Sequence, residues 1–189
     1  MPIGRFARYS SMRVFLDFEA SSLAKTSYPI EVGWVFENGE TDAFLIRPAP
    51  DWTDWDETAE HVHGISRERL QLEGIAHQDA CDRLVRSLST HTLFASAPSW
   101  DGHWLSMLLR AGGQPRHLLR LRDTEEVFVE AVRDGLGASA GPDRIIEIVS
   151  LARSVVENGP VAHRALQDAQ REMRIWREVQ RIVASRFVD

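Results

Sequence analysis

The sequence predicts an α/β fold, built on a mixed five-stranded sheet that is flanked by helices. Two patterns support this prediction. Over residues 14–47, three runs rich in β-branched and aromatic residues follow one another with short connections, which is typical of a three-stranded antiparallel meander. Further along, strand-like segments alternate with stretches of helical periodicity, and a strand that is reached through a helix usually lies parallel to its predecessor.

Length and composition favour one folded unit. The chain has 189 residues, 43% of them hydrophobic, which is enough for one sizeable core and short for two. We therefore expect a single domain over residues 1–189, with residues 1–11 as a flexible N-terminal extension. No apolar run approaches the roughly 18 residues that span a bilayer, and the N-terminus lacks the apolar centre of a signal peptide. A soluble, cytoplasmic protein is expected.

Cysteine and charge content restrict the chemistry. The single cysteine, Cys81, excludes an internal disulfide and a Cys-based zinc cage, and we expect it to fill space on a helix face. The net charge of −6 argues against nucleic-acid binding by bulk electrostatics, but not against a metal site made of carboxylates. Four arginines form the one local concentration of basic residues, which could contact phosphates or form a solvated surface: Arg110, Arg116, Arg120 and Arg122.

The first predicted strand, within residues 14–23, carries two acids in an apolar run. In a strand, residues two apart point to one face about 6.5 Å apart, so Asp17 and Glu19 aim at a common point while Phe18 points the other way. Two buried like charges are costly unless a cation lies between them, and a divalent ion would meet that need. The alternative is that the strand simply ends in solvent near Asp17.

The next two strands are expected at residues 30–36 and 42–47. The acidic loop that follows, residues 51–56, contains Trp52 and Trp55. These tryptophans could stack on a nucleobase, but packing beneath the loop is favoured.

A pair of histidines, His61 and His63, follows the acidic loop. No third nitrogen or sulfur ligand lies nearby, so the pair does not predict a zinc site. A turn at Gly64 and a helix N-cap at Ser66 are expected instead.

A third predicted acid lies at the start of a helix. A helix at 78–89 and a strand at 92–97 lead to a helix that begins at Pro98. Asp101 lies three and four residues before the apolar Trp104 and Leu105, so it heads the buried stripe. A favourable interaction with the helix dipole would explain this acid equally well.

A short strand at 118–121 is expected next, and Asp123 with Thr124 should cap the following helix. Pro142 should open a further helix that runs to about Val156 and is ended by residues 158–160.

The last helix carries two acids within its apolar arc. At 100° per residue, Asp168 and Glu172 fall among the apolar positions from Ala165 onwards, whereas Arg171 and most other basic residues fall on the opposite face. A buried carboxylate needs a partner of opposite charge, and a nearby arginine or backbone donor could satisfy Glu172. His163 stands at or before the helix start, close to Asp168 in sequence.

Taken in order, four motifs resemble those of the DEDDh 3′–5′ exonucleases of the ribonuclease H-like fold, such as ribonuclease T, oligoribonuclease and the proofreading subunits of polymerases. The motifs are Asp17-x-Glu19, then His63-Gly64-Ile65-Ser66, then Asp101, then His163 through Ala169. The segment Ala97–Trp100 lacks the Asn that many relatives carry before the third acid. Ser21-Ser22-Leu23 replaces their Thr-Gly-Leu type of sequence.

The resemblance implies a metal-dependent exonuclease that hydrolyses single-stranded RNA or DNA from the 3′ end to nucleoside 5′-monophosphates. It implies that two ions, Mg²⁺ or Mn²⁺, are held by Asp17, Glu19, Asp101 and Asp168, and that His163 is the general base. Substrate-binding roles are expected for Ser21, Ser22, Leu23 and His63. A homodimer is compatible with the sequence. Two alternatives remain: a catalytically inactive module that binds nucleic acid or protein, and a metal-dependent endonuclease or strand-transfer enzyme.

Overall fold

In the part of the chain that the structure describes, the central sheet has six strands, in the order β4-β3-β2-β1-β5-β6. The computed structural model describes residues 11–156 and 163–185. Strands β1 to β3 form an antiparallel meander, whereas β5 lies parallel to β1, β6 parallel to β5, and β4 parallel to β3. The strands are β1 Arg13–Ala20, β2 Pro29–Phe36, β3 Thr41–Arg47, β4 Ile75–Ala76, β5 Thr92–Ala95 and β6 Leu121–Asp123.

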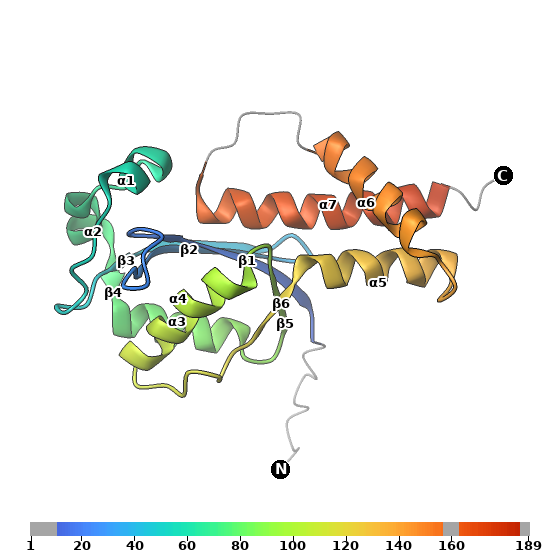
Figure 1. Cartoon of the computed structure of the whole chain (residues 1–189). Helices are drawn as coiled ribbons and strands as arrows, with labels where there is room; N and C mark the ends of the chain where they lie inside the picture. The colour runs from blue at the N-terminus through green and yellow to red at the C-terminus, as the bar shows by residue number, and fades with distance from the viewer. Residues whose placement is uncertain (1–10, 157–162, 186–189) are drawn as a thin grey trace, which may run out of the picture.

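Seven helices in the described residues surround this sheet (Figure 1). Helices α3 and α4 cover one face, α5, α6 and α7 cover the other, and α1 and α2 lie beyond one end. The helices are α1 Glu57–His63, α2 Arg67–Glu73, α3 His77–Leu88, α4 Pro98–Ala111, α5 Thr124–Leu136, α6 Pro142–Val156 and α7 Ala165–Ser185. The predicted class, a mixed α/β sheet flanked by helices, is confirmed.

Side-chain alternation on β1 divides the core into two layers. Val14, Leu16 and Phe18 pack with α3 and α4, whereas Phe15 packs on the other face with α5, α6 and α7. Asp17 and Glu19 have the same parity as Phe15, so they continue its row beneath α7. The expected common face of the two acids is therefore present.

Three expected elements differ from the structure. The sheet has six strands where five were expected, because the two residues of β4 pair with the end of β3. A strand of two residues is too short to show the alternation of apolar and polar residues that predicts strands. The strand expected at 118–121 lies instead at 121–123, because Leu119 is buried from an irregular segment beside α4 while Leu121 begins the pairing with β5. The strand expected to reach residue 97 ends at Ala95.

Local signals in the sequence are otherwise confirmed. Gly64 ends α1 in the left-handed conformation (φ 67°), and Ser66 caps α2 by accepting the N–H of Arg69. Asp123 and Glu126 form a reciprocal capping box at the start of α5. Helix α1 was not expected, and only the N-cap of α2 was, because seven residues are too few for a clear periodic stripe.

The residues expected to fill space do so. Cys81 is fully buried on α3. The ring of Trp52 stacks on Tyr28 at a centroid distance of 5.5 Å, and the indole N–H of Trp55 donates to Glu60 at 2.8 Å. Both tryptophans pack beneath the acidic loop, so packing is confirmed.

Some expectations fall on residues outside the described part. They are the N-terminal extension, except for residue 11, and the helix end at residues 158–160. Within the described residues, no helix combines the length and the apolar character needed to cross a membrane.

The start of α7 rests directly on β2. Gly33 of β2 pairs with Asp17, and a Cβ at Gly33 would overlap the backbone of Ala165 and Leu166. The carboxylate of Glu31, on the same face, accepts the N–H of Ala165 at 3.1 Å. It also accepts two hydrogen bonds from the guanidinium of Arg164, at 3.0 and 2.5 Å. This anchoring fixes the height of the first turn of α7 above the sheet.

We expect Gly33→Ala to destabilise the protein by about 1–3 kcal/mol, the usual cost of overpacking, because helix backbone must move to admit the methyl group. Denaturant unfolding measures this loss. Gly102→Ala in α4 is the matched control, since a Cβ there meets nothing within 4 Å and a helical Gly→Ala change is otherwise favourable. Equal stability of the two variants would contradict the close approach.

Candidate active site

Three carboxylates converge where β1 passes beneath the first turns of α7. Asp17 and Glu19 come from β1, and Asp168 comes from α7. One oxygen of each lies within 4.8 Å of the others. Residues separated by some 150 positions are brought together because Gly33 lets α7 approach the sheet.

Asp101 approaches the same region from α4. The pairing of β5 with β1 ends at Phe15, so β1 continues without that neighbour toward its acids. There the Oδ1 atom of Asp101 accepts the backbone N–H of Phe18 at 3.2 Å. Its Oδ2 atom is buried and has no hydrogen-bond partner among the described residues. Asp101 is 1% exposed and stands outside the tight group of three.

Burial raises the pKa of all four acids, and repulsion by neighbouring carboxylates adds to this for Asp17 and Glu19. The pKa of Asp17 lies well above its usual value, through desolvation and then the charges of Asp101, Glu19 and Asp168. Desolvation and the charges of Asp168 and Glu31 raise the pKa of Glu19 to about 8. Desolvation raises the pKa of Asp101 to about 7, and it also raises that of Asp168. A cation bound among these groups would relieve the repulsion.

Arg171 brings a positive charge to these acids, although it was expected on the opposite face of the helix. Helical projection places it on the face opposite Asp168, but its long side chain reaches back by one turn. One terminal nitrogen lies 3.2 Å from Asp168, and the other lies 3.4 Å from Glu172. This cation lowers the pKa of Asp168, yet desolvation outweighs it.

The donor set fits a divalent ion. Carboxylate oxygens are the ligands that Mg²⁺ and Mn²⁺ prefer. An orphaned buried oxygen on Asp101, beside three clustered carboxylates with raised pKa values, is the arrangement that a bound cation would complete. These four residues therefore form a candidate metal centre.

His163 lies at the rim of this centre, two residues before α7 begins. It is exposed, and its charge is among the influences that lower the pKa of Asp168. The expected placement, in the irregular approach to the helix with Asp168 in its first turns, is confirmed.

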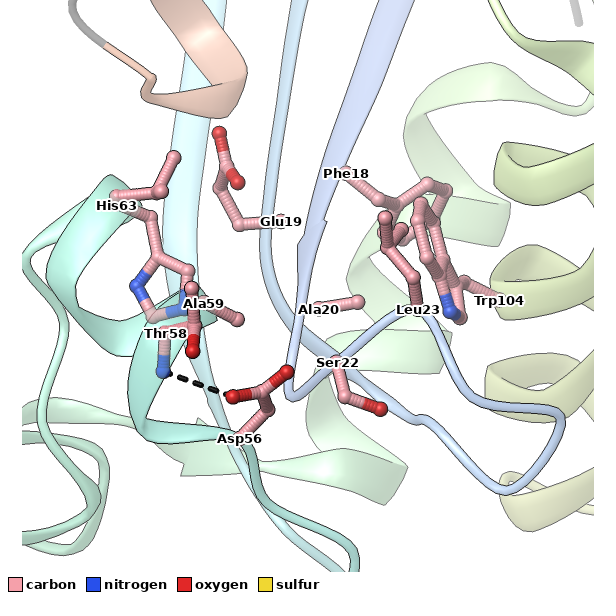
Figure 2. A pocket seen from close by; sticks show the side chains of 11 residues that line it. Phe18, Glu19, Ala20, Ser22, Leu23, Asp56, Thr58, Ala59, His63 and Trp104 are labelled. Atoms are coloured by element: carbon pink, nitrogen blue, oxygen red, sulfur yellow. Dashed lines mark hydrogen bonds between the residues drawn. The ribbon is translucent and has the colours of Figure 1, made fainter.

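A cavity of about 270 Å³ opens beside Glu19 (Figure 2). His63 and other residues of α1 form one wall, while Leu23 and Trp104 form the opposite one. The cavity is predominantly apolar, and Leu23 is 72% exposed at its edge. An apolar slot beside a carboxylate cluster suits a flat, polar-edged group such as a nucleotide. We call this cavity the site pocket.

His63 offers the site pocket a hydrogen-bond donor. Its Nδ1 atom accepts the N–H of Ile65 at 3.0 Å, which assigns the proton of the neutral ring to Nε2. Desolvation lowers the pKa of His63, so the neutral ring is favoured. Nε2 is buried and has no partner among the described residues, so it remains free for a ligand.

The segment after β1 is held by an acid that sequence reasoning missed. The carboxylate of Asp54 accepts hydrogen bonds from Ser21 (3.1 Å), Ser22 (2.5 Å) and Thr26 (3.1 Å). These bonds lower the pKa of Asp54. No local pattern reveals a contact across more than 25 residues; only the polar composition of the two loops hints at it.

The residues expected to bind substrate are thus not equivalent. Ser22, Leu23 and His63 line the site pocket, but Ser21 does not. Ser21 is fully buried, and its hydroxyl donates to Asp54 and accepts the N–H of Tyr28. Its place in the structure is that of a support for the loop. Trp104, which sequence reasoning treated only as a core residue, also lines the pocket.

Glu172 is satisfied without a ligand. It accepts a hydrogen bond from the Thr124 hydroxyl at 3.0 Å and is paired with Arg171. The expectation that a nearby arginine serves this acid is met, and a hydroxyl on α5 adds to it.

Comparison with known proteins identifies structural neighbours. No protein-family model matches the sequence, and no curated protein matches it. Among solved structures, Escherichia coli exonuclease I in complex with a dT13 oligonucleotide has a TM-score of 0.64 and 15% identity, over 95% of this chain and 43% of that one. A product-bound exonuclease I gives 0.64 and 15%, over 95% and 46%. Exonuclease I of Methylocaldum szegediense gives 0.63 and 17%, over 92% and 42%.

These similarities establish the fold. The ribonuclease H-like architecture expected from the motifs is confirmed, since the mixed sheet and its helices match exonuclease I over nearly all of this chain. The chain spans less than half the length of these solved proteins.

Proposed function

We propose that this chain is a metal-dependent 3′–5′ exonuclease that hydrolyses single-stranded nucleic acid to nucleoside 5′-monophosphates. The observation that carries the proposal is the carboxylate cluster of Asp17, Glu19 and Asp168, with Asp101 beside it, at the edge of a nucleotide-sized pocket. The fold shared with exonuclease I, whose solved complexes include dT13 and dA16 oligonucleotides, supports single-stranded DNA as a substrate.

The four acids would hold the metal, proposed to be two Mg²⁺ or Mn²⁺ ions. When bound, such ions supply Lewis-acid chemistry that stabilises the charge on the attacking and leaving oxygens of a phosphodiester displacement. The acids themselves bring negative charge to a fixed place, and α7 and β1 set their spacing. Bound cations would offset the repulsion between these carboxylates, so activity is expected to depend on metal.

The remaining residues would bind substrate and move a proton. The neutral imidazole of His163 would take the proton of the attacking water, and its exposed position at the rim leaves room for that water. Nε2 of His63 would donate a hydrogen bond to an oxygen of the terminal nucleotide. Leu23 and Trp104 would enclose its base. Asp54 would keep Ser22 and Leu23 in place.

A catalytically inactive binding module is the alternative. Buried acids with raised pKa values destabilise the metal-free protein above neutral pH, and a module without chemistry gains nothing from keeping them. The retained cluster therefore favours catalysis.

Substrates of matched sequence test the proposal. We expect a 5′-labelled single strand of DNA or RNA to shorten stepwise from its 3′ end, and a strand with a 3′-phosphate to resist. A blunt duplex should react at no more than about a tenth of the single-strand rate, since opening one base-pair step costs about 1.4 kcal/mol. Denaturing gels at constant salt measure all these rates. Equal cleavage of the blocked strand would favour an endonuclease, and equal rates on duplex would contradict the single-strand preference.

A further inference from the structure

A second cavity, of about 730 Å³, lies between α4 and the segment 112–121 that leads into β6. Three arginines line it, Arg110, Arg116 and Arg120, together with His103 and His117. No acid among the described residues lines it, although the whole chain carries a net charge of −6. We call this cavity the basic cleft. Such separation of charge within an acidic molecule marks a surface for an anionic partner.

The arginines of the basic cleft are free to bind an anion. Nε of Arg110 donates to the backbone oxygen of Ser106, and Nε of Arg116 donates to His117 at 2.7 Å. In the described part of the chain, no carboxylate lies within ion-pair distance of the three arginines of the cleft. Arg122, by contrast, is bound to Glu126 and Glu130 and does not line the cleft.

The basic cleft is linked to the site pocket across α4. His103 lines both the cleft and a smaller cavity that it shares with Lys25 and Trp100. The Trp100 ring stacks on Trp104 at a centroid distance of 5.7 Å, and Trp104 lines the site pocket. The cleft and the smaller cavity thus share His103, and the stacked pair Trp100 and Trp104 connects the lining of the smaller cavity to that of the site pocket. Pro98 and Gly102 of the cleft also flank Asp101 in the first turn of α4.

We propose that the basic cleft binds the phosphodiester backbone of the single strand on the 5′ side of the nucleotide held in the site pocket. This inference rests on the proposed exonuclease function. Guanidinium groups match phosphate oxygens in a two-pronged geometry, and helix α4, which lines both the cleft and the site pocket, makes the substrate strand the favoured occupant over an acidic polypeptide. The cleft would hold the strand between successive cleavages.

The test uses the intact chain and a triple variant, Arg110→Gln, Arg116→Gln and Arg120→Gln. All three side chains are exposed, so the fold should persist. The matched control has the same charge change at exposed arginines without a carboxylate partner in the described residues: Arg86→Gln, Arg133→Gln and Arg174→Gln. Strand binding is measured by fluorescence anisotropy in chelator over a range of salt. Hydrolysis is measured with metal, on a dinucleotide and on a strand of about twelve nucleotides.

We expect the triple variant to bind the long strand at least about tenfold more weakly than the wild type. The slope of log affinity against log salt should become shallower by about 2, because each of the three lost phosphate contacts contributes about 0.7 to it. Dinucleotide hydrolysis and the control variant should match the wild type. An unchanged slope would overturn the proposal. Polyglutamate serves as a second binding probe in the same anisotropy assay, and a triple variant that lost affinity for polyglutamate alone would assign the cleft to an acidic protein. Absence of hydrolysis of both the dinucleotide and the long strand by the wild type with metal would contradict the proposed function instead, because binding in chelator tests the cleft separately.

Discussion

Replacing Asp17 or Asp168 by asparagine is expected to lower the nuclease rate by about three orders of magnitude or more, because loss of one metal ligand removes several kcal/mol of transition-state stabilisation. The folded structure should survive either change. Each substitution removes a charge from a group of mutually repelling carboxylates, so the metal-free variant should be as stable as the wild type or more stable. Single-turnover rates and thermal unfolding measure the two effects.

Asp134→Asn is the matched control, because Asp134 is exposed near the end of α5. It should retain full activity, and the wild type should lose its activity in excess chelator and regain it with Mg²⁺ or Mn²⁺. Full activity in chelator, or in either site variant, would rule out the metal-dependent mechanism.

The same acids give the metal-free protein a characteristic pH dependence. Their folded-state pKa values are raised, to about 8 for Glu19 and about 7 for Asp101, above the usual value of about 4 in the unfolded chain. Their contribution to stability is therefore fully present below about pH 4 and is lost as the pH rises through 7 to 8. The melting temperature in chelator should fall over this range, less so in Asp17→Asn, and metal should restore it.

Replacing His163 by alanine is expected to cost about two to four orders of magnitude in rate, the usual contribution of general-base catalysis. A general base acts in its deprotonated form, so the wild-type rate should rise with pH, and the variant should lose that limb of the profile. Because His163 is exposed, added imidazole should enter the vacated space and restore part of the rate. Metal affinity, measured by calorimetry, should stay unchanged.

His61→Ala is the control for this experiment. His61 is exposed on α1 and does not line the site pocket, so its removal should leave the rate and its pH profile intact. Loss of metal binding in His163→Ala, with an unaltered pH profile, would identify His163 as a ligand and contradict its role as a base.

Period-two and helical patterns predicted the direction of the four acid side chains, and the resemblance to the exonuclease family grouped them into one expected site. Alternation placed Asp17 and Glu19 on one face, and the helical stripe placed Asp101 and Asp168 toward the core; each is so oriented. Such patterns report the direction of a side chain from its own backbone, which is fixed by the local dihedral angles.

Contacts made by the far end of a long side chain, or between distant loops, are not encoded in that way. Arg171 leaves α7 on the polar face and still reaches Asp168, because its guanidinium can fold back by a full turn. Asp54 holds Ser21 and Ser22 only because β2 and β3 return the chain to the same end of the sheet. The four-arginine concentration was visible, but only the fold separates the three that line the cleft from Arg122.

The hydrogen bond from the Phe18 amide to Asp101 has a consequence for solubility as well as for chemistry. Where β5 ends, the remaining length of β1 would present an unpaired strand edge, and such an edge recruits strands from other molecules. A buried carboxylate placed against that edge takes up the free amide and repels an incoming strand, because a second backbone cannot satisfy its charge. This acid of the candidate metal centre would thus also protect the sheet from intermolecular pairing. Asp101 variants should therefore be judged by their aggregation as well as by their activity.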